Sequence, residues 1–116
     1  MDYKYIKTDY LEMVAGGDSD LLKELVNLFR DQVGEFNHDM KAQFEKKNYK
    51  ALGNLAHKAK SSVSIMGMDS LANMLKIFEV QATEEKNTNM YKSYIQRFEN
   101  DTKCALDELD RLIKNM

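Results

Sequence analysis

Apolar residues recur along this chain at steps of three and four, and no proline interrupts them. That spacing places them on one face of an α-helix, and a segment without proline can continue as a helix without a break. The chain also has only five glycines, too few for the many tight turns of a multistranded β-protein. We therefore expect an all-α fold.

The pattern predicts four long helices. The first follows the glycines at 16 and 17, begins with Asp18 or Ser19 as its cap, and carries an apolar stripe almost to Lys47. Gly34 interrupts this stripe at a cost of about 1 kcal/mol, which is too little to break the helix. The other three are expected at about 49–66, from 69 or 70 to 83, and at about 90–113.

The sequence also predicts two connections between the long helices and a short helix near the N-terminus. Gly67 ends the second helix, because glycine tolerates a left-handed conformation, and residues 84–89 form a polar loop. A short helix around 9–14, capped by Thr8 or Asp9, closes one end. Because short loops favour antiparallel neighbours, residues 1–116 are predicted to form one domain, an antiparallel four-helix bundle with a short N-terminal helix.

Composition excludes several classes of function. Seventeen Lys and Arg against nineteen Asp and Glu give a charge of −2, so a nucleic-acid partner is not expected. The single cysteine, Cys104, cannot form an internal disulfide, and with only His38 and His57 beside it a structural zinc site is not expected either. Neither a membrane span of ~20 apolar residues nor a signal peptide is visible, so we expect a cytoplasmic protein.

One histidine lies off the apolar stripe of its helix. At about 100° per residue, His57 is about 160° from Leu55 and from Ala59, so its ring is expected to point to solvent. The neighbours within two turns on this outer face are mostly small: Gly53, Lys60, Ser61 and Ser64. Because no tall side chain flanks the ring, a partner surface can approach it closely.

This arrangement suits nucleophilic chemistry. A neutral imidazole is a competent nucleophile near neutral pH. Lys60, three residues after His57, can hydrogen-bond a phosphoryl group on the ring. The geometry alone leaves open the alternative that His57 is an exposed histidine without a role.

The run from Ala56 to Gly67, A-H-K-A-K-S-S-V-S-I-M-G, resembles the signature of histidine-containing phosphotransfer (HPt) domains. That signature is roughly A-H-x-L-K-G-S-S-x-x-L-G, followed by a leucine and by L-E on the next helix; Leu71 and Phe78-Glu79 correspond here. The glycines and aspartate at 16–18 and the Leu-Leu-x-x-Leu pattern after them are also similar to these domains, so the resemblance covers nearly the whole chain.

Four positions depart from the family pattern. Ser61 stands where glycine is commonest, Ala59 where leucine is usual, Val63 where a second serine often occurs, and Gly34 where many members have proline. All four keep the site small or the stripe apolar, so none removes the phosphoryl acceptor. The hydroxyl of Ser61 can either bond the phosphoryl group or crowd it.

The resemblance implies a phosphorelay intermediate of a two-component system. His57 would accept a phosphoryl group from the phospho-aspartate of a receiver domain and pass it to another receiver, with Lys60 contacting the phosphoryl group. Glu79 matches the position whose side chain lies near the histidine in the family and would supply a supporting hydrogen bond. Lys58 would lie at the rim of the partner interface, with clearance for the partner from Gly53, Ser61 and Ser64, while Gly67 is structural.

The expected partners are response-regulator receiver domains and a hybrid sensor kinase. The chain has no P-loop or glycine-rich nucleotide-binding stretch, so we expect a phosphocarrier without ATP-dependent kinase activity and without a cofactor of its own. The sequence leaves the oligomeric state open, and a monomer is expected. The divalent metal is expected on the receiver. Two alternatives remain: an HPt-like adaptor that binds receivers without being phosphorylated, and an unrelated structural helical bundle.

Other residues are expected to be structural or solvated. His38 lies off the first stripe and is expected in solvent, and the methionines are expected to fill the core. Cys104 is expected as a small buried residue at the inner edge of the last helix. Glu84, Glu85 and the acidic residues of the last helix are expected on a solvated surface. The N-terminal methionine and the final helix favour a free-standing protein.

Overall fold

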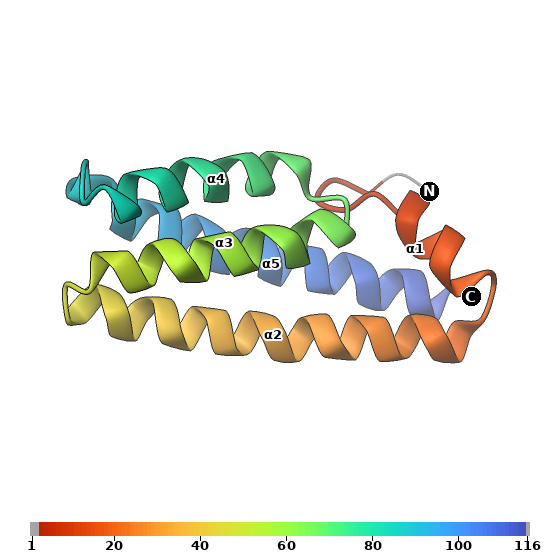
Figure 1. Cartoon of the computed structure of the whole chain (residues 1–116). Coiled ribbons are helices and arrows are strands. Elements are labelled where there is room, and N and C mark those ends of the chain that lie inside the picture. The colour runs from red at the N-terminus through yellow and green to blue at the C-terminus, as the bar shows by residue number, and fades with distance from the viewer. Residues whose placement is uncertain (1–2, 116) are drawn as a thin grey trace.

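The computed structural model of the chain describes residues 3–115, and these are helical with short connections (Figure 1). The α-helices are α1 (Asp9–Ala15), α2 (Ser19–Glu45), α3 (Tyr49–Ile65), α4 (Asp69–Thr83) and α5 (Tyr91–Lys114), with a 3₁₀ turn at Thr88–Met90. The expected all-α fold is therefore confirmed, and most predicted helix ends lie within about two residues of the observed ones.

The four long helices run alternately up and down, and α1 lies across the end of the molecule where α2 begins and α5 finishes (Figure 1). Each long helix packs against two others: α3 contacts α4 and α2, and α5 contacts α2 and α4. The antiparallel four-helix bundle with a short N-terminal helix at one end is confirmed. The molecule measures 44 × 20 × 19 Å, so its length is close to that of α2.

The helix starts differ in how they are capped. The Asp18 carboxylate accepts hydrogen bonds from the backbone N–H groups of Asp20 and Leu21 at 3.0 and 3.2 Å, as expected for the cap of α2. Thr8 occupies the cap position of α1, but its side chain accepts no backbone hydrogen bond, and its hydroxyl donates to the Glu12 carboxylate. Helix α4 follows Met68 without a side-chain cap.

The core is one continuous apolar cluster between the helices. Each long helix contributes residues from one face, and the largest fully buried side chains include Phe29, Met40, Leu52, Leu75, Phe78, Tyr91, Phe98 and Leu109. None of the helices within residues 3–115 is long and apolar enough to cross a membrane.

Glu108 on α5 is a buried carboxylate, which corrects the expectation that the acidic residues of the last helix are solvated. Its side chain is only 6% exposed and accepts hydrogen bonds from the backbone N–H groups of Lys4, Tyr5 and Ile6 at 2.8, 2.8 and 3.1 Å. A carboxylate accepts several such bonds at once, and a buried charge is tolerated only when it is paired in this way. Glu108 therefore fixes the N-terminal segment onto the bundle.

Gly67 ends α3 and also makes room for that segment. Its φ is +72°, the left-handed conformation predicted from the sequence. A Cβ atom built at Gly67 would lie 2.5 Å from the Lys7 Cβ and 2.6 Å from the Lys7 backbone nitrogen. The Lys7 N–H also donates to the carbonyl of Met66 at 3.1 Å. A side chain at 67 is thus excluded both by the backbone angle and by the close approach of the N-terminal segment.

Candidate functional site

The ring of His57 points outward from the middle of α3. Its side chain is 62% exposed, whereas Ala56 and Ala59 beside it on the helix are fully buried. The sequence expectation of a solvent-facing imidazole is confirmed. A reagent or a partner surface can therefore reach the ring without any rearrangement of the bundle.

Glu79 of α4 holds one side of this ring. Both carboxylate oxygens, Oε1 and Oε2, lie 3.1 Å from Nδ1 of His57. An ionised carboxylate only accepts hydrogen bonds, so in this pairing Nδ1 carries the proton and the lone pair of the neutral ring is on Nε2. The proximity that the family resemblance implied for Glu79 is present, and the contact selects the tautomer of His57.

Lys60 completes a cluster of three charged or titratable groups. Its Nζ lies 3.7 Å from Glu79 Oε1, and its side chain is 30% exposed, one turn of α3 beyond His57. Because Glu79 contacts both partners, its carboxylate joins the cation and the imidazole across the contact between α3 and α4. An ammonium group is therefore held close to the ring without touching it.

Gly53 lies inside the contact between α3 and α4, which corrects its assignment to an open outer face. The residue is buried, and a Cβ atom built there would lie 2.6 Å from the Thr83 Oγ1, 3.2 Å from the Thr83 backbone nitrogen and 3.3 Å from the Glu79 carbonyl oxygen. Helix α3 packs against two neighbours, so its buried arc is wider than its apolar stripe. Gly53 gives α4 room to approach and does not provide clearance for a partner.

We expect Gly53→Ala to destabilise the protein by about 1–2 kcal/mol, because the overpacking against α4 exceeds the gain in helix propensity. Gly34→Ala is the matched control: it is also a glycine inside a helix, but nothing lies within 4 Å of its Cβ position. That variant should be more stable than the parent by about 0.5–1 kcal/mol. Urea unfolding of the two variants measures the difference. Equal stabilisation by both substitutions would contradict the close packing at Gly53.

The remaining residues expected at the site are on the exposed side of α3. Lys58 and Ser61 are exposed, as the small-residue pattern predicted. Ser64 is exposed too, but its hydroxyl donates to the Lys60 carbonyl at 2.8 Å, within its own helix. The short side chains of Ser61 and Ser64 thus leave space on the outer face of α3, whereas Gly53 makes room for α4 on its inner side.

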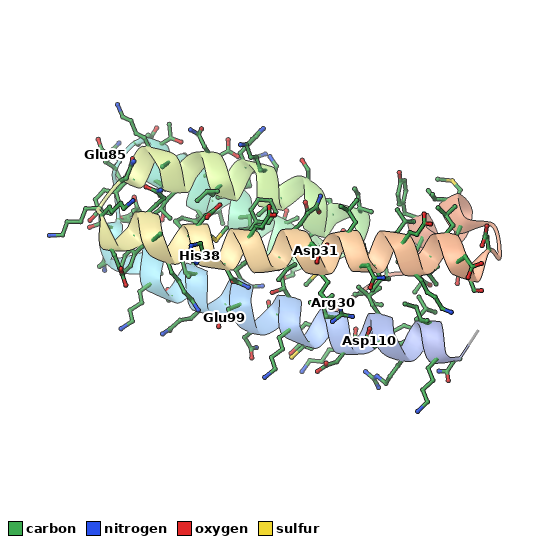
Figure 2. The ribbon with its side chains drawn as sticks, turned by 90° about the horizontal axis from the view of Figure 1, so that it is seen from below. Arg30, Asp31, His38, Glu85, Glu99 and Asp110 are labelled. Carbon is green, nitrogen blue, oxygen red and sulfur yellow. The ribbon has the colours of Figure 1, made fainter. Side chains whose placement is uncertain are left out.

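His38, the second histidine, lies on the exposed face of α2, on a different helix from His57 (Figure 2). Ion pairs between α2 and α5 flank this region, from Arg30 to Asp110 and from Lys41 to Glu99. Within the described residues His38 forms no hydrogen bond or ion pair with a carboxylate. It therefore lacks the second-helix partner that distinguishes His57.

Exposed apolar side chains on α3 and α4 were not among the residues expected from the sequence. Ile65 is 42% exposed, and Ile77 and Val80, which lie close to Glu79 in sequence, are 52% and 49% exposed. On the helical wheel each of the three lies more than about 100° from the centre of the buried stripe of its own helix, so the angular argument that exposes His57 could also have identified them. The solvent-facing surface of α3 and α4 is therefore partly apolar.

No group of three or more His, Cys, Asp or Glu side chains with the geometry of a metal site occurs among residues 3–115. Compared with models of protein families, with curated proteins and with solved structures, the chain gives no match. Its function must therefore be inferred from the cluster of His57, Glu79 and Lys60.

Proposed function

We propose that this protein is a phosphorelay intermediate that accepts a phosphoryl group on Nε2 of His57 and passes it to another protein. The observation that carries the proposal is the orientation of the ring: it is exposed, and Nδ1 is bonded to Glu79. Nε2 is then the nitrogen with a free lone pair. This combination supports transfer better than it supports a purely structural role for the bundle.

The donor proposed is a receiver-domain phospho-aspartate. The lone pair of Nε2 attacks phosphorus, the bond from phosphorus to the aspartyl oxygen breaks, and its electron pair returns to that carboxylate. The ring becomes a phosphoimidazolium, whose positive charge is shared with Nδ1–H next to Glu79. In the onward step an acceptor aspartate attacks phosphorus and the Nε2–P electron pair returns to the ring. Such transfer depends on in-line positioning and on neutralisation of the phosphoryl oxygens.

Lys60 supplies a positive charge for the phosphoryl oxygens. It lies one turn from His57 and is loosely paired, since 3.7 Å to the Glu79 Oε1 is a long ion-pair distance. Rotation of its flexible side chain brings Nζ toward a group on Nε2. The divalent metal for the reaction belongs to the receiver, and the protein itself is proposed to have neither a cofactor nor ATP-dependent kinase activity.

The docking surface proposed is the exposed side of α3 and α4. Lys58 lies at its rim, where a charge mainly changes association rate. The exposed Ile65, Ile77 and Val80 offer apolar contacts on the same two helices. The partners proposed are receiver domains, with a hybrid sensor kinase upstream, in the cytoplasm, and the protein is proposed to act as a monomer in a transient complex.

The test is transfer from phosphorylated receiver domains. We expect the purified protein to take ³²P-phosphate from at least one receiver of its own cell, giving a label that is labile in acid and stable in alkali. A protein that binds a phosphorylated receiver but takes no label would be an adaptor, and this result would overturn the proposal. Absence of both binding and label with the full set of receivers would also overturn it.

Lys60→Ala is expected to slow phosphoryl transfer by about 10-fold, because one charge that stabilises the phosphoryl oxygens is removed. The fold should persist, since Lys60 is partly exposed and its ion pair with Glu79 is long. Lys23→Ala is the matched control: it removes an exposed lysine of α2, outside the proposed docking surface, and should change the rate by less than about 2-fold at physiological ionic strength. Rapid-quench kinetics measure both rates, and circular dichroism checks helicity. Equal effects of the two variants would refute the assignment of Lys60.

A further inference from the structure

We propose that Glu79 keeps the proton on Nδ1 after His57 has been phosphorylated, so that the phosphoryl group stays transferable at pH values where an isolated phosphohistidine has lost that proton. The inference rests on the proposed function, because it concerns the phosphorylated form of the same site. It adds to that function a positioning residue that sets the pH range of onward transfer.

The leaving group explains why this proton matters. When an acceptor oxygen attacks phosphorus, the Nε2–P bond breaks and its electron pair stays on Nε2. With Nδ1 protonated the group that leaves is neutral imidazole. Without that proton it is an imidazolate anion, which is a far poorer leaving group. A phosphohistidine is therefore ready to transfer only while Nδ1 holds its proton.

The contact with Glu79 favours the protonated form. Both carboxylate oxygens are 3.1 Å from Nδ1, and the Glu79 side chain is only 28% exposed, so solvent screens its charge less than at an open surface. A nearby opposite charge stabilises the charged form of a titrating group. Phosphorylation on Nε2 leaves Nδ1 and this hydrogen bond in place, because the two nitrogens point to different sides of the ring.

The other charges around the ring are cationic and outnumber this carboxylate, yet none of them contacts Nδ1. On α3 they are Lys60, which pairs with Glu79 at 3.7 Å, and the exposed Lys58; on α4 the exposed Lys76 lies one turn before Glu79. Helix α2, packed on the other side of α3, gives the ring no ion pair within residues 3–115. Glu79 is thus the group in direct contact with Nδ1, and Lys60 opposes its effect.

The protein contains its own comparator. His38 is also exposed on a helix but has no carboxylate partner within the described chain. Phosphoramidate, a small phosphoryl donor, modifies exposed histidines without any receiver. His38→Gln therefore leaves phospho-His57 beside Glu79, whereas His57→Gln leaves phospho-His38, which is exposed near Asp31, Glu35 and Asp39 but bonded to none of them. Adding Glu79→Gln to the first variant keeps a hydrogen-bond acceptor for Nδ1 but removes its charge.

The experiment is a ³¹P NMR titration of these three phosphorylated proteins, with the rate of phosphate release followed over the same pH range. We expect phospho-His57 beside Glu79 to lose its ring proton at a higher pH than phospho-His38 and than phospho-His57 in the Glu79→Gln variant. The decline in phosphate release should shift with it. Because Glu79→Gln also breaks the ion pair with Lys60, the Glu79 comparison is repeated in a Lys60→Met background. In that background only the charge of Glu79 differs between the two proteins.

Equal midpoints with Glu79 and with its glutamine replacement, in both backgrounds, would overturn the inference. That result would leave the relay proposal intact, because transfer from receivers would be unaffected by it. Conversely, a His57 that is modified by phosphoramidate but by no receiver would refute the relay, while the measured midpoints would still report the effect of Glu79 on the ring.

Discussion

His57→Gln is expected to abolish phosphoryl acceptance, with labelling from a phosphorylated receiver reduced on the order of 100-fold or more. Glutamine has about the length of histidine but offers no nucleophilic nitrogen near neutral pH. The substitution should leave the bundle intact, since 62% of the His57 side chain is exposed and its partner Glu79 can accept a hydrogen bond from the amide. Autoradiography after incubation with the labelled receiver measures the loss.

His38→Gln is the matched control for this experiment. It makes the same chemical change at the other histidine, which is exposed on α2 (Figure 2). Labelling of that variant should equal labelling of the parent. If the His57 variant accepted label as well as the parent, or if the His38 variant lost it, the phosphoryl acceptor would have been assigned to the wrong residue.

Glu108→Gln is expected to destabilise the protein by about 2–4 kcal/mol, the largest change in stability we foresee. The parent carboxylate accepts three backbone N–H groups, at Lys4, Tyr5 and Ile6. The glutamine amide has only one acceptor oxygen. Its NH₂ group, itself a donor, would face backbone N–H donors in a buried site. Unfolding in urea measures the free energy, and hydrogen exchange at residues 4–6 should accelerate.

Asp107→Asn controls for the loss of a negative charge on α5. Asp107 is exposed and immediately precedes Glu108 in sequence. We expect its substitution to change stability by less than about 0.5 kcal/mol, as is usual for surface positions. A Glu108 variant as stable as the Asp107 variant would show that the three hydrogen bonds contribute nothing net to folding.

The helices could be predicted from the sequence because each carries its own information. The stripe from Leu22 to Phe44, the glycine at 67 and the carboxylate of Asp18 are local signals, and each has the predicted effect. The exposure of His57 followed in the same way, from its angle to the stripe of its own helix. The spacing of apolar residues within one helix is enough to separate its inner from its outer face.

Contacts between elements could not be predicted in this way. The single apolar stripe of α3 defines one inner direction and predicts Gly53 at the surface, whereas two neighbouring helices cover α3. Glu108 was assigned to solvent by its charge, although it lies about 60° from Ala105 on the helical wheel, and that angle could have placed it at the edge of the core. Glu79 was found only through the family resemblance, since nothing in its own helix points to His57.

The absence of a side chain at Gly53 has a consequence for reactivity. Glu79 and Thr83 come close to α3 at this point, and the distance between the two helix axes there also sets how far the Glu79 carboxylate lies from the ring. A methyl group at 53 would act as a spacer, lengthening the bond to Nδ1 while leaving all three site residues in place. The hydrogen bond that orients the imidazole therefore depends on a residue without a side chain, one helical turn away.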